Sequence, residues 1–458
     1  MKPSLPQGTR DFNAATIHRR QYILQTIREV FELYGFEPLE TPAMENLETL
    51  MGKYGEEGDK LIFKILNNGL DMPAKRPEAR HNFEKVLEGK NLKEITERAL
   101  RYDLTIPFAR YISMNHGTLN LPFKRYQMQP VWRADRPQKG RYREFYQCDA
   151  DIAGTLSLLS DSELALIYLE VFRRLKIPVA VKLNNRKVLS ALASLCGSPE
   201  SLTAITIAID KLDKIGIEKV RMELAARGLS EAQVQLVDRY LHIEGSNEAM
   251  LQQARDLFGT TELANQGLDD LETLLNQVKS NLVTKGDGLL KLDFTLARGL
   301  NYYTGTIYEV KATGVEMGSI GGGGRYDDLT GLFDLPGIPG VGISFGVDRI
   351  YDVMSDLQLF PSEIQKTTEV LFFNLGEKES AVAFRLMQEL RAAGVRSELF
   401  YEPAKMDKQF RYANRKQIPY VVIIGSEELA TSQCMVKDLA KSEQHKIPLE
   451  SLVFFLKK

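Results

Sequence analysis

The feature of this chain that most constrains its fold is a long helical block enclosed by strand-like sequence. Apolar residues recur at helical spacing over residues 187–286. Four glycines fall where successive helices could end, namely Gly216, Gly228, Gly245 and Gly259. Ser198-Pro199-Glu200 is typical of a helix start, because serine caps a helix and proline suits its first turn. The sequence therefore predicts a separate helical module, or an insertion in a larger domain.

After this block the spacing of apolar residues changes to period two. Residues 292–296 and 307–311 alternate on either side of a turn at 304–305, which predicts an antiparallel pair of strands. The glycine run 321–324 is typical of a tight turn, or of backbone that approaches a ligand closely. Residues 342–349 resemble a strand that leads into a helix.

The two ends of the chain have patterns of their own. Residues 16–35 show helical spacing and end at a glycine. A polar stretch, 72–97, interrupts the strand-like and loop-like sequence that follows, and we expect it to be exposed. Beyond a linker-like segment at 360–363, strand-like and helix-like runs alternate from 369 to 425. That rhythm predicts a small α/β domain.

Length and composition limit the class of protein. A chain of 458 residues is too long for one compact core. Its formal net charge is only -2, so a nucleic-acid partner would have to be held by local patches. The three cysteines lack C-x-x-C spacing and the five histidines form no H-x-x-x-H pair, so we expect neither disulfides nor a zinc site. No apolar run could span a bilayer and no targeting pattern is visible, so we expect a cytoplasmic protein without membrane contact.

Residues 124–149 combine basic and aromatic side chains. Seven of these residues are basic and three are acidic. Arg133 follows an apolar, strand-like stretch, where a charge is costly unless it meets a fixed anion. A guanidinium group matches phosphate oxygens, which favours phosphate binding for Arg133. For Arg136 and Lys139, a solvated hairpin with ion pairs to nearby acids is an equally open interpretation.

Two further clusters carry ligand-binding chemistry. Arg298 stands near Tyr302 and Tyr303 at the end of a predicted strand, where it could reach a carboxylate or phosphate. Because neighbours on a strand face opposite ways, we expect one of the two tyrosines to lie in the core. The glycine run leads into Arg325-Tyr326-Asp327. Nothing in the sequence matches G-x-x-x-x-G-K-[ST], so arginines must hold the phosphates if ATP is used.

The tail domain contains a basic stripe. Lys408, Arg411 and Arg415 recur at three and four residues, so they share one face of a helix, with Phe410 and Tyr412 between them. The stripe is either a solvated helix face or a surface that follows phosphates while the aromatic rings stack on bases.

Taken together and in this order, these segments resemble the histidyl-tRNA synthetases, a family of class II aminoacyl-tRNA synthetases, over nearly the whole chain. Residues 132–145 and 346–349 resemble motifs 2 and 3 of the class. Residues 298–303 and 322–327 resemble the two signatures peculiar to the histidine enzymes, which make the assignment specific. Asn301 departs from the aspartate common in the family, Ala150 varies within a binding segment, and Asp135 replaces a glutamate frequent in bacterial members.

The resemblance implies an α+β fold. Residues 1–186 and 287–360 would form the class II catalytic core around an antiparallel sheet, 187–286 a helical insertion, and 368–458 an α/β anticodon-binding domain. It also implies a homodimer that activates L-histidine with ATP and Mg²⁺ to histidyl-adenylate. The histidyl group would then pass to the 3′ end of tRNA(His).

The resemblance further assigns roles to residues, with no metal site among the protein side chains. Arg133 and Arg298 would be catalytic. Histidine would be bound by Asp103, Leu104, Thr105, Arg133, Gln147, Asp151, Arg298, Tyr302 and Tyr303. ATP would be bound by Arg133, Asp135, Arg141, Phe145 and Arg349, while Arg136 and Gln138 would face the tRNA acceptor end. An imidazole ring offers a donor and an acceptor, so such a pocket would reject apolar amino acids.

Two other interpretations stay open from the sequence. One is a non-catalytic relative, such as the synthetase-like regulatory subunit of ATP phosphoribosyltransferase, although those relatives generally lack the tail domain. The other is an RNA-binding module of synthetase descent, which need not keep Arg133, Arg298 and Arg349 together.

Overall fold

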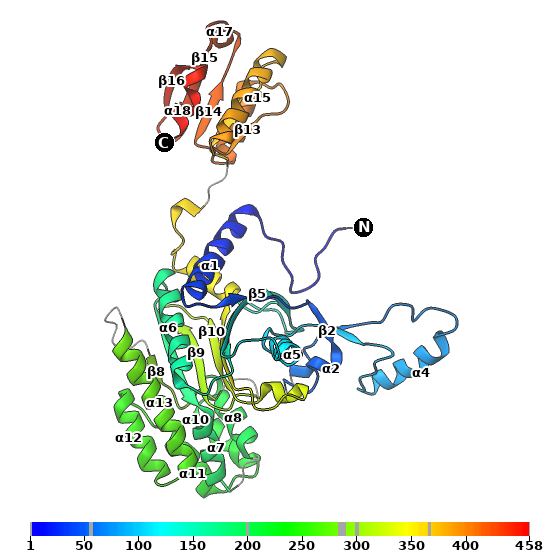
Figure 1. The fold of residues 1–458 in the computed structure, drawn as a ribbon, viewed down its shortest axis with the longest axis vertical. Coiled ribbons are helices and arrows are strands. Elements are labelled where there is room, and N and C mark those ends of the chain that lie inside the picture. Colours follow the sequence, from blue (N-terminus) through cyan, green and yellow to red (C-terminus); the bar gives the residue numbers. More distant parts are fainter. Residues whose placement is uncertain are drawn as a thin grey trace. The chain divides into compact units, whose positions relative to one another are not determined.

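A computed structural model describes residues 2–54, 58–197, 201–282, 290–297, 302–364 and 368–457. The predicted helix start at 198–200 and Arg298 lie outside these residues. The chain divides into two compact units, Met1–Phe360 and Pro361–Lys458. Each unit is built on its own sheet (Figure 1).

The first unit is centred on an eight-stranded sheet with the strand order β1-β5-β6-β11-β10-β9-β7-β8. In that order the strands are Glu37–Pro38, Phe123–Trp132, Glu144–Ala153, Gly340–Gly346, Gly321–Tyr326, Thr306–Ala312, Val179–Asn185 and Leu290–Leu292. All neighbours are antiparallel except the two outermost pairs, β1–β5 and β7–β8, which are parallel. This confirms the mainly antiparallel core that the family resemblance implied.

Two details of the strand prediction are wrong. Residues 292–296 and 307–311 do not pair with each other, because β8 and β9 lie on opposite sides of β7. The glycine run 321–324 is not a turn: it forms most of β10, between β9 and β11. Alternation along the chain identifies a strand but does not identify its partner, since pairing depends on distant residues.

Three helices pack together with this sheet: α1 (Ala14–Leu33), α6 (Leu158–Arg174) and α14 (Val347–Asp356). The predicted helix at 16–35 is confirmed as α1. The Asn13 side chain accepts a hydrogen bond from the Thr16 backbone N–H, and Gly35 follows the helix with a positive φ, as a helix terminator does. Ile23, Ile27, Val30 and Phe31 are buried in the main hydrophobic cluster.

The predicted helical block is confirmed. It comprises α7 (Arg186–Leu195), α8 (Ser201–Asp210), α9 (Leu212–Ile215), α10 (Ile217–Ala226), α11 (Glu231–Leu241), α12 (Asn247–Phe258) and α13 (Glu262–Asn281). Gly216, Gly228, Gly245 and Gly259 follow successive helices with positive φ. In Figure 1, these helices gather beside β7, β8 and β9, and α13 packs on α6 and α7. Their apolar faces belong to the same hydrophobic cluster as the sheet, so the block is part of the first compact unit.

The chain before β5 forms a small sheet, two helices beside it and a projecting arm. A small sheet joins β2 (Met44–Asn46), β4 (Arg98–Leu100) and β3 (Lys64–Ile65), beside α2 (Leu47–Leu50) and α5 (Thr105–Asn115). Between β3 and β4 the chain extends outward and carries α4 (Arg76–Leu87) (Figure 1). Asn82 is the one buried residue of α4, so the expected exposure of residues 72–97 is confirmed for this helix.

The second unit has the predicted α/β rhythm. Parallel strands β12 (Val370–Phe372), β13 (Ser397–Leu399) and β14 (Tyr420–Ile423) alternate with α15 (Glu377–Ala392) and α16 (Met406–Arg415). An antiparallel extension that the sequence analysis did not predict, β15 (Gln433–Asp438) and β16 (Glu443–Pro448), completes the sheet. Of the helices that the structure describes in either unit, none combines the length and apolarity needed to cross a membrane.

Candidate active site

One face of the eight-stranded sheet is polar and the other is apolar. Gln127, Asp149, Ser344, Gly322 and Glu309 are register partners across five successive strands. Residues opposite one another in an antiparallel sheet project from the same face, so these form one polar row. The other face carries core residues: Tyr126, Met128, Cys148, Ala150, Ile343 and Phe345. Polar groups gathered on one face of a sheet, where burial is costly unless they find partners, point to a ligand site.

The glycines of β10 and β11 leave room on this polar face. A Cβ atom on Gly324 would lie 2.9 Å from the Tyr303 ring, and one on Gly342 would lie 2.0 Å from the Asp151 carboxylate. Any side chain at either position would displace a neighbour that lies over the sheet. Glycine is therefore required here by close packing over a strand, rather than by a turn.

Three buried carboxylates, Asp103, Asp149 and Asp151, lie around one buried cation, Arg125. The Arg125 guanidinium forms an ion pair of 2.7 Å with Asp151 and stacks 4.3 Å from the centroid of the Phe108 ring. Burial raises the pKa of Asp149 to about 7, and the positive charge of Arg125 opposes that shift. Acidic groups outnumber the buried cation Arg125 in this pocket, which suits a positively charged ligand group.

Asp103 and Asp151 each accept hydrogen bonds from tyrosine hydroxyls. Tyr54 donates to Asp103 at 2.9 Å, and Tyr302 donates to the other Asp103 oxygen at 3.5 Å. The Tyr326 hydroxyl donates to Asp151 at 2.7 Å. Burial raises the pKa of Asp103, and Arg133 opposes this shift.

Tyr302 and Tyr303 both border this pocket. Their rings lie 5.1 Å apart, both are partly buried, and neither residue belongs to a strand, since β9 begins at Thr306. The expectation that one of them is a core residue is therefore wrong. It rested on strand alternation, which does not apply in this irregular segment.

A cavity of about 140 Å³ lies beside the carboxylates. It is lined by Arg133, Asp135, Gly140, Arg141, Tyr142, Phe145, Gln147, Ser319, Ser344, Gly346, Asp348 and Arg349. All five residues predicted to bind ATP are in this set, together with Gln147. Arg136 and Gln138 are exposed in the loop between β5 and β6 that also carries Asp135 and Arg141.

Two of the three arginines that line this cavity, Arg133 and Arg349, donate hydrogen bonds to backbone oxygens. Arg133 donates from Nε to the Tyr102 carbonyl, and its guanidinium lies 5.2 Å from the centroid of the Phe145 ring. Arg349 donates to the carbonyls of Gly140 and Ser319 at 2.8 and 2.7 Å. These backbone contacts fix the positions of both guanidinium groups before a ligand arrives, as an anion site requires.

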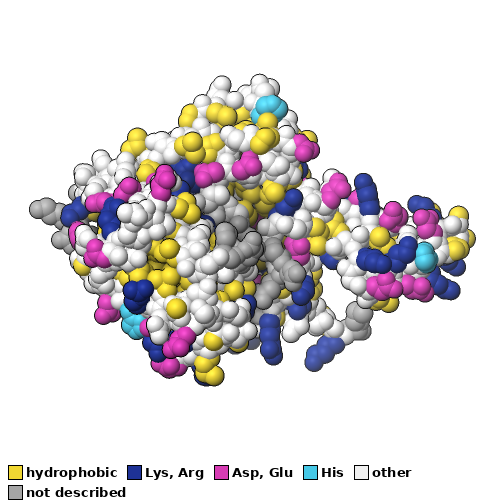
Figure 2. Space-filling view, turned by 90° about the horizontal axis from the view of Figure 1, so that it is seen from below, with side chains coloured by type: hydrophobic (Ala, Val, Ile, Leu, Met, Phe, Trp, Pro, Cys, Tyr) yellow, Lys and Arg dark blue, Asp and Glu magenta, His cyan; other side chains and the backbone are white. Residues whose placement is uncertain are grey.

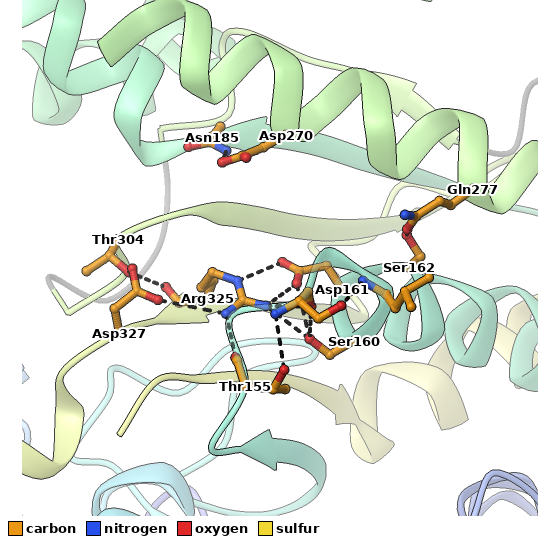
Figure 3. Close-up of polar contacts among 12 residues, drawn as sticks. Thr155, Ser160, Asp161, Ser162, Asn185, Asp270, Gln277, Thr304, Arg325 and Asp327 are labelled. Carbon is orange, nitrogen blue, oxygen red and sulfur yellow. Dashed lines mark hydrogen bonds and ion pairs between the residues drawn. The ribbon is translucent and has the colours of Figure 1, made fainter. Parts of the chain in front are cut away.

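Arg325 follows the glycine run that the sequence analysis linked to ligand binding. In the structure it belongs to a structural network and not to the ligand cavity (Figure 3). It is 5% exposed and pairs with Asp161 of α6, which is fully buried. Its backbone carbonyl accepts a hydrogen bond from the Thr304 N–H at 2.8 Å, and the Thr304 hydroxyl donates to Asp327 at 2.6 Å. This network anchors the segment that carries Tyr302 and Tyr303.

The sequence analysis gave no site role to several residues in or beside the polar face: Tyr54, Arg125, Asp149, Tyr326 and Ser344. Asp149 carried a usable signal, because it lies between Cys148 and Ala150 inside a strand-like run, where a charge must face something other than core. Tyr54 and Ser344 carried no such signal, since only the fold brings them to the pocket.

The mainly antiparallel sheet, the arginine-lined cavity beside buried carboxylates and the separate α/β unit define a class II aminoacyl-tRNA synthetase. Residues 90–350 match the family model for histidyl-tRNA synthetase, and residues 369–458 match that for an anticodon binding domain. The chain belongs to the histidyl-tRNA synthetase family.

Individual relatives agree with this assignment. The chain is 49% identical to the histidine–tRNA ligase of Bacteroides fragilis, covering 100% of this chain and 99% of that protein. The crystal structure of histidyl-tRNA synthetase from Nostoc sp. PCC 7120 matches with a TM-score of 0.80 and 33% identity, covering 100% and 99% of the two chains. A Bacillus halodurans structure titled as an ATP phosphoribosyltransferase regulatory subunit/histidyl-tRNA synthetase matches with a TM-score of 0.71 at 19% identity, over 93% of this chain and 100% of that one. At this level of identity, the similarity to the Bacillus halodurans structure shows a shared fold only.

Proposed function

We propose that this chain is a histidine–tRNA ligase whose adenylation site is the polar face of the eight-stranded sheet. The observation that carries the proposal is that Arg133, Arg141 and Arg349 line one cavity directly beside the Asp103–Asp149–Asp151 pocket. An arginine-lined cavity suits a polyphosphate, and a negative pocket suits an amino-acid ammonium group and a nitrogen heterocycle. The two subsites meet at Gln147, where the carboxylate of an amino acid would meet the α-phosphate of a nucleotide.

The first half-reaction joins the two ligands. A histidine carboxylate oxygen attacks the ATP α-phosphorus, a new phosphorus–oxygen bond forms, and the bond to pyrophosphate breaks. Arg133 and Arg298 stabilise the charge on the α-phosphate and the carboxylate, and Arg349 and Arg141 hold the outer phosphates. Fixed guanidinium groups lower the barrier because they need no rearrangement as negative charge builds up. Phe145 stacks on adenine, and Asp135 lies near the same base.

Mg²⁺ would enter with the ATP phosphates. Within the described part of the chain, no three His, Cys, Asp or Glu side chains are grouped as metal ligands. The cavity supplies mainly arginines, which suits a nucleotide that brings its own cation with few protein ligands. The bound ion would neutralise phosphate charge.

The histidine subsite uses the carboxylate pocket. Asp103 and Thr105, with Leu104 between them at the start of α5, and Gln147 hold the ammonium and carboxylate end. Asp151, Tyr302 and Tyr303 face the imidazole ring. Because Asp151 is already paired with Arg125 and Tyr326, its position is fixed before histidine arrives. A pocket with fixed polar partners rejects apolar amino acids, since these would leave the partners unpaired.

The second half-reaction moves the histidyl group to tRNA(His). A hydroxyl of the terminal ribose attacks the carbonyl carbon of histidyl-adenylate, and AMP leaves. Arg136 and Gln138, which are exposed in the loop between β5 and β6, face the acceptor end. We assign catalysis to residues 1–186 and 287–360, the helical insertion to 187–286 and anticodon binding to 368–458. In the last of these, Lys408, Arg411 and Arg415 recur along α16.

Tight binding of tRNA would have to come from local groups of positively charged residues. Charges of both signs are interspersed on the face shown in Figure 2, including the α4 arm, and the net charge is -2. A net charge close to zero gives little overall attraction for tRNA, so affinity would depend on placed contacts. We place the enzyme in the cytoplasm, where its substrates are made.

We also propose a homodimer. Met44 on β2, Met114 on α5 and Leu332 on η1 (Leu329–Phe333) are exposed apolar side chains on elements around α5. Exposed apolar groups on neighbouring elements are typical of a subunit interface.

Histidine-dependent exchange of pyrophosphate into ATP tests the central proposal. The unaltered chain should catalyse exchange with histidine and with no other of the twenty amino acids. Absence of exchange, with an active histidyl-tRNA synthetase as the control, would favour a non-catalytic relative and overturn the proposal.

A further inference from the structure

The segment that precedes α1 lies against the loop between β5 and β6. The Gly8 carbonyl accepts a hydrogen bond from the Arg143 backbone N–H at 2.9 Å, and the Arg143 carbonyl accepts one from the Arg133 N–H at 3.0 Å. The same loop supplies three residues of the proposed ATP cavity: Asp135, Gly140 and Arg141. Backbone pairing therefore joins the N-terminal segment to one wall of that cavity.

Gly8 is required for this contact. Its φ is +83°, a conformation that side chains rarely adopt. A Cβ atom at this position would also lie 2.8 Å from Arg143 Cγ and 3.0 Å from Pro137 Cγ. Any side chain at position 8 would therefore push the segment away from the loop.

Arg10 extends the contact from the backbone to the cavity itself. Its guanidinium lies 3.2 Å from the centroid of the Tyr142 ring and forms an ion pair with Asp348. Tyr142 on the loop and Asp348 in the first turn of α14 both line the cavity. One side chain from the N-terminal segment thus connects two walls of the cavity that are distant in the chain.

Arg10 also balances a carboxylate in a cavity that is proposed to hold phosphates. Asp348 is buried, and its Oδ1 atom accepts hydrogen bonds from both Arg10 and Arg20. Its other oxygen accepts one from the Tyr146 N–H at 3.2 Å. A carboxylate without such partners would repel phosphate groups, because like charges interact strongly where water is scarce.

We infer that Arg10 is a positioning residue for the ATP site, which holds the Tyr142 end of the loop against Asp348 before the nucleotide binds. The inference rests on the proposed ATP cavity and adds residues 8–10 to the parts that shape it. Arg10 acts through Tyr142 and Asp348. When binding requires one loop arrangement, the apparent dissociation constant rises as the fraction of molecules in that arrangement falls. Loss of Arg10 should therefore weaken ATP binding and spare the histidine subsite.

The KM values for ATP and for histidine in pyrophosphate exchange, each with the other substrate saturating, separate positioning from general damage. For Arg10→Ala we expect the KM for ATP to rise about tenfold, because roughly one molecule in ten would keep the loop in place. The KM for histidine should stay within about twofold. The histidine subsite is held by separate contacts, those of Asp151 with Arg125 and Tyr326, and distant sites act independently.

Two further variants and a matched control test the contact independently. Gly8→Val separates the segment from the loop while Arg10 stays present, and it should give the same selective rise as Arg10→Ala. Arg10→Lys keeps a positive charge beside Asp348 but lacks the planar group that stacks on the loop, so the KM for ATP should rise only about threefold. Arg19→Ala removes an arginine of α1 that stacks on Phe360 at 5.1 Å, and it should change neither KM.

Trypsin measures the release of the loop without any substrate. Lys139 and Arg141 are exposed in the loop. Cleavage after these two residues, identified from fragment masses, follows the fraction of molecules in which the loop has opened. In Arg10→Ala this cleavage should be several times faster than in the unaltered chain. Cleavage after Lys90, which is exposed beyond α4, is the internal reference and should keep its rate.

The outcomes distinguish this inference from the ligase proposal. Equal rises in both KM values of Arg10→Ala, or a rise in neither, would overturn the role of Arg10, although exchange would still depend on histidine. Unchanged cleavage of the loop would also overturn it, because the segment would then not hold the loop. Absence of exchange in the unaltered chain would overturn the ligase proposal, and trypsin would still test the contact between the segment and the loop.

Discussion

Replacing Asp161 by asparagine should destabilise the first unit by about 3 kcal/mol. Arg325 and Asp161 form a buried ion pair, and removing one partner of such a pair costs roughly 3–5 kcal/mol. Asparagine keeps the shape but removes the nearer counter-charge of Arg325, and Asp327 remains at 3.8 Å. The guanidinium keeps its hydrogen bonds to the carbonyls of Thr155 and Ser157 and to the Ser160 hydroxyl, at 3.1, 3.3 and 3.0 Å. We therefore expect a loss near the lower end of that range.

Tryptophan fluorescence during urea unfolding measures the stability of the first unit, which contains Asp161. The chain has one tryptophan, Trp132 at the end of β5, so the signal reports the first unit alone. The free energy of unfolding follows by linear extrapolation. Glu97→Gln is the control, because the Lys93–Glu97 ion pair is exposed and should contribute less than about 0.5 kcal/mol.

The same variant tests the anchoring of the tyrosine segment. Since the Arg325 backbone holds Thr304, Asp161→Asn should also raise the KM for histidine under conditions where the protein stays folded. A loss of stability below about 1 kcal/mol would refute the reasoning about the buried pair. A full loss of stability with an unchanged KM would refute the anchoring of Tyr302 and Tyr303.

Three further predictions follow from the same structure. Arg133→Ala should lower kcat for pyrophosphate exchange by roughly 10²-fold or more, because a fixed cation at the reacting phosphate is lost, and an unchanged kcat would contradict its role. A chain ending at Phe360 should keep exchange but lose most tRNA charging, and full charging would show that the second unit does not read tRNA. Burial raises the pKa of Asp149 to about 7, so the stability contributed by this group is full below its unfolded pKa near 4 and falls as the pH rises through 7. Between pH 6 and pH 8 the free energy of unfolding of the unaltered chain should fall by about 1.4 kcal/mol more than that of Asp149→Asn. Urea unfolding at both pH values measures the two changes, and equal changes would exclude this coupling.

Local sequence determined the secondary structure of much of this protein. The helix α1 followed from its apolar spacing and its terminal glycine, and the tail strands β12, β13 and β14 followed from their alternation with helices. These signals are local, because a helix cap or a strand alternation depends on residues only a few positions apart. The family resemblance then supplied the site residues as an ordered set.

Only the tertiary structure decided which segments meet. It placed β7 between β8 and β9, made the glycine run a central strand, and committed Arg325 to Asp161 instead of a ligand. It also brought Ser344 opposite Asp149, although they are almost two hundred residues apart in the chain. Strand register and the burial of charge are set by contacts between distant segments, and no local pattern in the sequence encodes those contacts.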